Sequence, residues 1–128
     1  MKRIYAGICL SISLLFSCQQ KAGDFQSLPA DEFATLIASP EVQRLDVRTL
    51  AEYSDGHIPG SLNINMLDEQ FESVADSLLQ KDRPVTLYCR SGKRSKKAAR
   101  LLSSKGYKVY ELDKGFQSWQ QEKFEIEK

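Results

Sequence analysis

Histidine, tryptophan and cysteine are scarce in this sequence, and neither sign of charge predominates. Its 128 residues include one histidine, one tryptophan and three cysteines, and the formal net charge is +1. A balance of this kind argues against a nucleic-acid-binding protein, which needs a basic excess. No internal repeat or low-complexity segment is present, which excludes a repeat protein. The length suits one domain, and 41% hydrophobic residues are enough to form its core.

A hydrophobic run long enough to span a bilayer comfortably is also missing. The longest apolar stretch, residues 4–16, is short for that purpose and follows the basic pair Lys2 and Arg3. A basic start followed by a short apolar stretch and a polar break is typical of an export signal. We therefore expect residues 1–17 to be a signal peptide rather than part of the fold.

The end of this signal segment predicts how the protein is anchored. Leu15 to Cys18 reads Leu-Phe-Ser-Cys, which resembles the box that precedes the acylated cysteine of bacterial lipoproteins. We expect Cys18 to carry lipid, residues 18–24 to form a tether, and the protein to face the periplasm from the cell envelope. Ordinary secretory cleavage near Ser17, which would leave a free Cys18 in a periplasmic protein, is the alternative.

The few cysteines leave no pair for an internal disulfide. Loss of the signal peptide removes Cys9, and acylation would occupy Cys18, so Cys89 would be the only free thiol of the mature chain. The exported domain is then not a disulfide scaffold. Whether Cys89 is incidental or reactive depends on its neighbourhood.

From residue 25 onward, segments with strand character alternate with segments with helical spacing. This alternation predicts one domain over residues 25–128, a three-layer α/β/α fold around a mostly parallel five-stranded sheet. In such sheets ligands bind beyond the carboxyl ends of the strands. The predicted strands are 25–27, 44–48, 61–64, 84–88 and 107–112. One predicted helix begins at Pro29, and the others cover 66–80, 95–104 and 115–123. A short helical turn is predicted at 52–53.

Cys89 ends one of these strands and opens the most informative stretch of the chain. A short loop with three cationic side chains and one glycine follows it, and then an alanine- and leucine-rich helix begins. The backbone N–H groups of such a loop and the positive end of the helix dipole favour a thiolate over a thiol. The thiolate is the nucleophilic form. The loop residues are Arg90, Ser91, Gly92, Lys93, Arg94 and Ser95.

Four ordered motifs give the chain a resemblance to single-domain rhodaneses, which are sulfurtransferases. The resemblance runs from about Phe25 to Trp119. Two residues depart from the pattern, because Lys114 and Lys123 stand where the family often has glycine. The motifs are Asp46-Val47-Arg48 with Glu52-Tyr53, the segment 56–64 from Gly56-His57-Ile58-Pro59-Gly60 to Ile64, the loop 89–95, and Gly115-Phe116 with Trp119.

The resemblance implies a thiosulfate sulfurtransferase with Cys89 as its nucleophile. It implies that residues 90–95 bind a small anionic sulfur donor, that a thiol or cyanide accepts the sulfur, and that neither a cofactor nor a metal takes part. Arg94 is expected to brace the loop as well as to contact substrate. Arg90 and Lys93 are expected to point toward the incoming anion.

Other residues of the motifs are expected to support the loop rather than to react. We expect Asp46 and Arg48 to form a structural pair, and His57 to stabilise its own loop rather than to act as a base. Phe116 and Trp119 are expected in the core. For the basic residues beyond the loop we expect an exposed helix face, formed by Lys96, Lys97 and Arg100.

Two other functions fit an activated cysteine of this kind. Phosphatases and arsenate reductases of the same fold place five residues between cysteine and arginine, whereas four separate Cys89 from Arg94 here. The shorter loop favours sulfur chemistry. A non-catalytic persulfide carrier or a binding module of the cell envelope is the second alternative.

Overall fold

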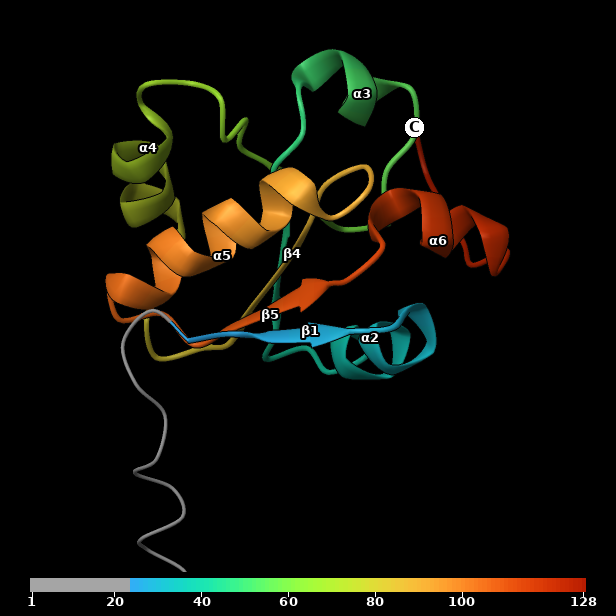
Figure 1. Cartoon of the computed structure of the whole chain (residues 1–128), viewed down its shortest axis with the longest axis horizontal. Coiled ribbons are helices and arrows are strands. Elements are labelled where there is room, and N and C mark those ends of the chain that lie inside the picture. Colours follow the sequence, from blue (N-terminus) through green and yellow to red (C-terminus); the bar gives the residue numbers. More distant parts are fainter. Residues whose placement is uncertain (1–23) are drawn as a thin grey trace, which may run out of the picture.

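The computed structural model describes residues 24–128 (Figure 1). The predicted signal peptide, Cys18 and most of the predicted tether lie outside the described residues. Within 24–128 no helix is both long and apolar enough to cross a membrane.

One sheet of five strands forms the centre of the domain. All four strand pairings are parallel, and the order across the sheet is β1-β5-β4-β2-β3. The predicted parallel sheet is therefore confirmed, and β4, which leads to Cys89, is its central strand. The strands are β1 (Gln26–Leu28), β2 (Gln43–Asp46), β3 (Leu62–Asn63), β4 (Val85–Tyr88) and β5 (Val109–Leu112).

Helices cover both faces of the sheet and complete the three layers (Figure 1). Apolar residues of α4 and α5 pack against one face, and those of α2 and α6 pack against the other. The short α3 follows the carboxyl end of β2. The helices are α2 (Ala30–Ile37), α3 (Leu50–Ser54), α4 (Phe71–Leu78), α5 (Lys93–Ser104) and α6 (Gly115–Gln121).

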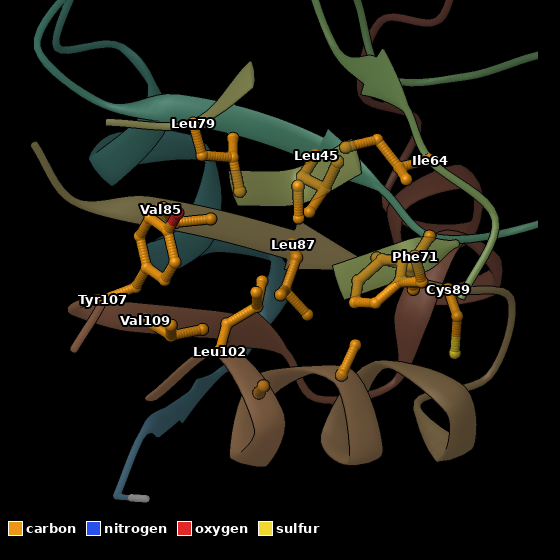
Figure 2. Close-up of a cluster of buried hydrophobic side chains, with 14 residues drawn as sticks. Leu45, Ile64, Phe71, Leu79, Val85, Leu87, Cys89, Leu102, Tyr107 and Val109 are labelled. Carbon is orange, nitrogen blue, oxygen red and sulfur yellow. The ribbon is translucent and has the colours of Figure 1, made fainter. Parts of the chain in front are cut away.

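The alternation of side chains along β4 decides which way Cys89 faces. Val85, Leu87 and Cys89 belong to the core beneath α4 and α5, whereas Tyr88 belongs to the core beneath α2 and α6. Successive side chains of a strand point to opposite faces, so the thiol is directed to the α5 side. Figure 2 shows Cys89 at the end of this buried row, with its sulfur turned toward the helix.

Several helices differ in their bounds from the predictions, since α3 is longer than the predicted turn at 52–53 and α6 ends two residues before 123. The helix predicted over 66–80 begins only at Phe71, because Asn65 and Asp68 accept hydrogen bonds from backbone N–H groups two residues later and form turns. Leu67, which lies within the predicted range of that helix, is 66% exposed in this turn. The helix predicted over 95–104 begins two residues earlier, at Lys93, directly after Gly92.

Candidate active site

The active-site loop runs from Cys89 to Ser95 and is held by the start of α6. The N–H of Phe116 donates to the Cys89 carbonyl at 2.8 Å, and that of Gln117 donates to the Arg90 carbonyl at 3.0 Å. A Cβ on Gly115 would overlap the Arg90 carbonyl. The glycine of the fourth motif therefore lets α6 approach the loop closely.

Gly92 allows the loop to turn back on the sulfur. Its φ of 106° lies in the left-handed region, and a Cβ there would overlap the carbonyl oxygen of Asp113. In this conformation the Gly92 N–H donates to Cys89 Sγ at 3.1 Å. The single glycine of the loop thus places one donor on the sulfur.

The Cys89 thiol lies in an environment that favours its ionisation. The residue is only 1% exposed, and it is the free cysteine of residues 24–128. Burial raises the thiol pKa, but the hydrogen bonds that a thiolate can accept, from the Ser95 hydroxyl once it turns to the sulfur and from backbone N–H groups, outweigh burial, so the pKa of Cys89 is lowered. The backbone donors belong to Ser95, Gly92 and Ser91.

Ser95, the last residue of the loop, connects the sulfur to a buried carboxylate. Its hydroxyl oxygen lies 3.5 Å from Cys89 Sγ, and its O–H donates a hydrogen bond to Glu111 Oε2 at 2.5 Å. Glu111 comes from β5 and was not among the predicted site residues. A detectable signal existed, because Glu111 continues the row of Tyr107 and Val109, which are buried in the core on this face.

Arg94 is turned toward α3. Its guanidinium forms two hydrogen bonds with Glu52, Nη1 to Oε1 at 2.8 Å and Nη2 to Oε2 at 2.9 Å. The bonds from Arg94 lower the pKa of Glu52 to about 2. The predicted bracing role of Arg94 therefore has a defined partner, which the sequence analysis did not identify.

Arg90 and Lys93 are exposed, as predicted for residues that meet an incoming anion, and so is Ser91. Neither cation forms an ion pair with another residue of the described range. Arg90 also lines a cleft of about 440 Å³ beside the loop. The other lining residues are Arg48, Glu52, Asp55, Gly56, Phe116, Gln117 and Gln120.

Lys96 corrects one prediction for the basic helix face. It is not simply exposed, because its ammonium contacts Glu111 at 3.3 Å and Asp113 at 2.9 Å and also reaches the Asp113 carbonyl at 3.0 Å. These contacts connect α5 to the end of β5. Lys97 and Arg100 are exposed as expected.

Asp46 and Arg48 form a buried ion pair at the end of β2. Arg48 Nη2 lies 2.6 Å from Asp46 Oδ2 and also donates to the Gly56 carbonyl at 2.7 Å. The guanidinium carbon lies 4.4 Å from the ring centroid of Phe116. Arg48 thus joins the second motif to the start of α6, and it forms with Asp46 the ion pair that the sequence predicts. Phe116 and Trp119 are buried, as expected for core residues.

His57 belongs to the loop that Arg48 holds. Its ring stacks on Tyr53 with centroids 3.7 Å apart, and Nδ1 is 2.8 Å from the Tyr53 carbonyl oxygen. Its backbone pairs with Glu127 near the chain end through two hydrogen bonds of 2.9 Å. These contacts fit the predicted supporting role of His57.

Possible metal ligands do not gather in the described part of the chain. No group of three or more histidine, cysteine, aspartate or glutamate side chains in residues 24–128 is arranged to hold a metal ion.

Comparison with known proteins gives a consistent result. The family model described as rhodanese-like domain matches residues 29–122. A thiosulfate sulfurtransferase GlpE of Shewanella oneidensis is 33% identical over 98 residues, covering 74% of this chain and 92% of the relative. A sulfurtransferase of Allochromatium vinosum is 38% identical over 85 residues, covering 66% of this chain and 77% of the relative.

A solved structure of another protein has the same fold as this chain. The crystal structure of a rhodanese-related protein from Thermoplasma volcanium has a TM-score of 0.69 and 29% sequence identity, and covers 80% of this chain and 98% of its own. The shared architecture therefore extends over nearly all of the described residues.

Proposed function

This chain belongs to the rhodanese-like domain family and is a sulfurtransferase at the level of that family, and we propose that it transfers sulfur through a persulfide on Cys89. In the first step the Cys89 thiolate attacks the outer sulfur of an anionic donor such as thiosulfate. The sulfur–sulfur bond of the donor breaks, and sulfite leaves with the bonding electron pair. In the second step a thiolate or cyanide attacks the outer sulfur of the persulfide and restores the Cys89 thiolate.

The observation that carries this proposal is the environment of the Cys89 sulfur. The sulfur accepts a hydrogen bond from the Gly92 N–H at 3.1 Å, and Gly92 directly precedes α5. Backbone donors at a helix N-terminus stabilise negative charge without giving up a proton. The same donors can stabilise the thiolate before attack and the thiolate that is restored after transfer.

Arg90 and Lys93 are well placed to attract the anionic sulfur donor. Both are exposed, and neither is neutralised by an ion pair within residues 24–128. A cation at the rim of a site raises the local concentration of a small anion. We assign them to the approach of thiosulfate and the departure of sulfite, and we assign Arg94 to bracing.

A phosphatase or arsenate reductase activity is less well supported. Phosphatases and arsenate reductases of this fold have five residues between cysteine and arginine, whereas Arg94 follows Cys89 after four residues and binds Glu52 with both terminal nitrogens. A guanidinium engaged in this way has less capacity left for an equatorial oxygen.

We also propose that the mature protein is attached to the cell envelope by lipid on Cys18 and faces the periplasm. The support is the pattern of Lys2 and Arg3, the apolar residues 4–16 and the box ending at Cys18. The near-neutral charge fits small-molecule and thiol partners rather than nucleic acid.

A turnover assay tests the proposed activity. Purified protein should convert thiosulfate and cyanide to thiocyanate repeatedly, and the Cys89→Ser variant should not. If the wild type accepts a single sulfur per chain and then stops with every acceptor tried, the carrier alternative is correct. If Cys89→Ser retains the activity, the proposed nucleophile is wrong.

A further inference from the structure

The hydroxyl of Ser95 lies between two groups that compete for its hydrogen. On one side is Glu111 Oε2 at 2.5 Å, and on the other is Cys89 Sγ at 3.5 Å. A serine hydroxyl has one hydrogen to donate and two lone pairs with which to accept. Ser95 therefore cannot donate to the carboxylate and to the sulfur at the same time.

The distances show which group holds the hydrogen in this structure. The short bond to Glu111 is of the charge-assisted kind, whereas 3.5 Å to sulfur suits an S–H donating to the Ser95 oxygen. In this arrangement the lone pairs of Ser95 face Cys89 and favour its neutral thiol. A thiolate would need the hydroxyl to turn around.

Several contacts hold the Glu111 carboxylate in place, so that it stays within hydrogen-bond distance of the Ser95 hydroxyl. The residue is 0% exposed, and its other oxygen accepts from the Ser27 hydroxyl of β1 at 2.6 Å. Lys96 of α5 lies 3.3 Å from Oε2 and is shared with Asp113, which follows β5. Glu111 therefore keeps two further partners when Ser95 turns away.

We propose that Glu111 is a positioning residue that controls the nucleophile by directing the Ser95 hydroxyl. While Ser95 donates to Glu111, the sulfur lacks this side-chain donor, and the thiolate is stabilised by the backbone N–H groups alone. When Cys89 loses its proton to solvent, the Ser95 hydrogen turns to the sulfur, and Glu111 retains Ser27 and Lys96. The proposal rests on the proposed function only in taking Cys89 as the nucleophile.

Other charged residues near the sulfur also affect its ionisation, so their effect must be distinguished from the effect of Glu111 through Ser95. Arg94, paired with Glu52, lies on the α3 side, and the Asp46–Arg48 pair lies at the end of β2. Lys96 and Asp113 lie on the Glu111 side. Because removal of any negative charge would favour a thiolate, the route through Ser95 needs its own control.

The central variant is Glu111→Gln, and the measurement is the pH dependence of Cys89 alkylation by iodoacetamide. The full-length chain is used, and the alkylated peptide that carries Cys89 is quantified by mass spectrometry. The glutamine amide can donate to the Ser95 oxygen and so release its hydrogen toward the sulfur. We expect the pKa of Cys89 to fall by roughly one unit, which is about tenfold more thiolate below the pKa.

Two control experiments distinguish an effect of the Ser95 hydroxyl on the Cys89 pKa from a general effect of the lost negative charge. Asp113→Asn removes a negative charge from the same lysine without touching Ser95, and should change the Cys89 pKa by less than half as much. In the Ser95→Ala background, Glu111→Gln should also lose most of its effect. An unchanged or higher Cys89 pKa in Glu111→Gln, or an equal shift with and without the Ser95 hydroxyl, overturns the proposal.

A second variant covers the case in which Glu111→Gln does not fold. Lys96→Met leaves Glu111 in place without its cation, so Glu111 should hold the Ser95 hydrogen more strongly. The Cys89 pKa should then rise, and rise less when Ser95 is alanine. A fall, or the same rise in both backgrounds, contradicts the proposal. Alkylation needs no sulfur donor, so these outcomes are independent of whether the protein transfers sulfur.

Discussion

Arg94 and Glu52 are joined by two parallel hydrogen bonds of 2.8 and 2.9 Å, although 42 residues separate them in the chain. Arg94 belongs to the end of the active-site loop, which forms the first turn of α5, and Glu52 lies in α3. Glu52 also forms a capping box with Thr49, in which each residue's side chain accepts a hydrogen bond from the other's backbone N–H. The pair therefore ties the loop to the carboxyl end of β2 through a helix that is itself capped.

The first prediction concerns acid stability. Arg94 lowers the pKa of Glu52 to about 2 from an ordinary value of 4.5, so the stabilisation is complete above pH 4.5 and is lost as the pH falls toward 2. Glu52→Gln can keep the capping box but not the charge. At pH 7 the variant should be less stable by about 1–2 kcal/mol in urea unfolding. The difference should shrink by pH 3, and an equal difference at both pH values contradicts the assigned pair.

The second prediction concerns the turn at Gly92. Gly92→Ala adds a Cβ that overlaps the Asp113 carbonyl, so the loop must shift and its N–H must leave the sulfur. We expect a loss of about 100-fold in thiosulfate turnover, as for other displaced catalytic geometry. Gly106→Ala is the matched control, because Gly106 has nearly the same φ, 105°, but its Cβ would meet only Lys81 at 3.9 Å. The control should lose about 1–2 kcal/mol of stability and keep its activity.

The loop around Cys89 could be predicted because its signal is local. An apolar strand, a cysteine, a glycine within three residues and a helical repeat all lie within residues 85–104. The layers could be predicted for the same reason, since each strand and helix has its own periodicity. The parallel pairing then brings the ends of β2 and β4 together, which places the Asp46–Arg48 pair near the loop.

The partners of the loop could not be predicted because they depend on packing between distant segments. Glu52 and Glu111 lie 42 and 16 residues from Arg94 and Ser95, respectively. The alternation with Tyr107 and Val109 indicates the face on which Glu111 lies, but nothing near either glutamate in the sequence specifies its partner. Lys96 was expected to share an exposed helix face with Lys97 and Arg100, and its ion pairs with Glu111 and Asp113 follow only from the packing of α5 against β5. The start of α4 was missed because turns formed by Asn65 and Asp68 replace its first turn.

The third prediction concerns the two lysines at positions where the family often has glycine. Lys123 has a φ of 62°, in the left-handed region, whereas Lys114 has an ordinary φ of −101°. Lys123→Gly should relieve strain and raise the free energy of unfolding by roughly 0.5–1 kcal/mol, after the greater freedom of glycine in the unfolded chain is counted. Lys114→Gly is the matched control and should give no gain. Equal effects at the two positions in thermal unfolding would refute this explanation.

The fourth prediction concerns the proposed lipid anchor. In cells fed a labelled fatty acid, the protein should carry label, and Cys18→Ala should remove it. The labelled protein should partition with membranes, whereas the variant should not be processed to the same mature form. Recovery of an unlabelled soluble wild-type protein would instead support ordinary cleavage near Ser17.

The most direct measurement is the intact mass of the protein after incubation with thiosulfate in the absence of an acceptor. We predict that the intact mass increases by one sulfur atom, that digestion places it on the peptide that contains Cys89, that cyanide or a thiol removes it, and that Cys89→Ser gains none. Turnover of thiosulfate with no sulfur ever found on Cys89, or an equal mass increase in Cys89→Ser, would contradict the persulfide mechanism.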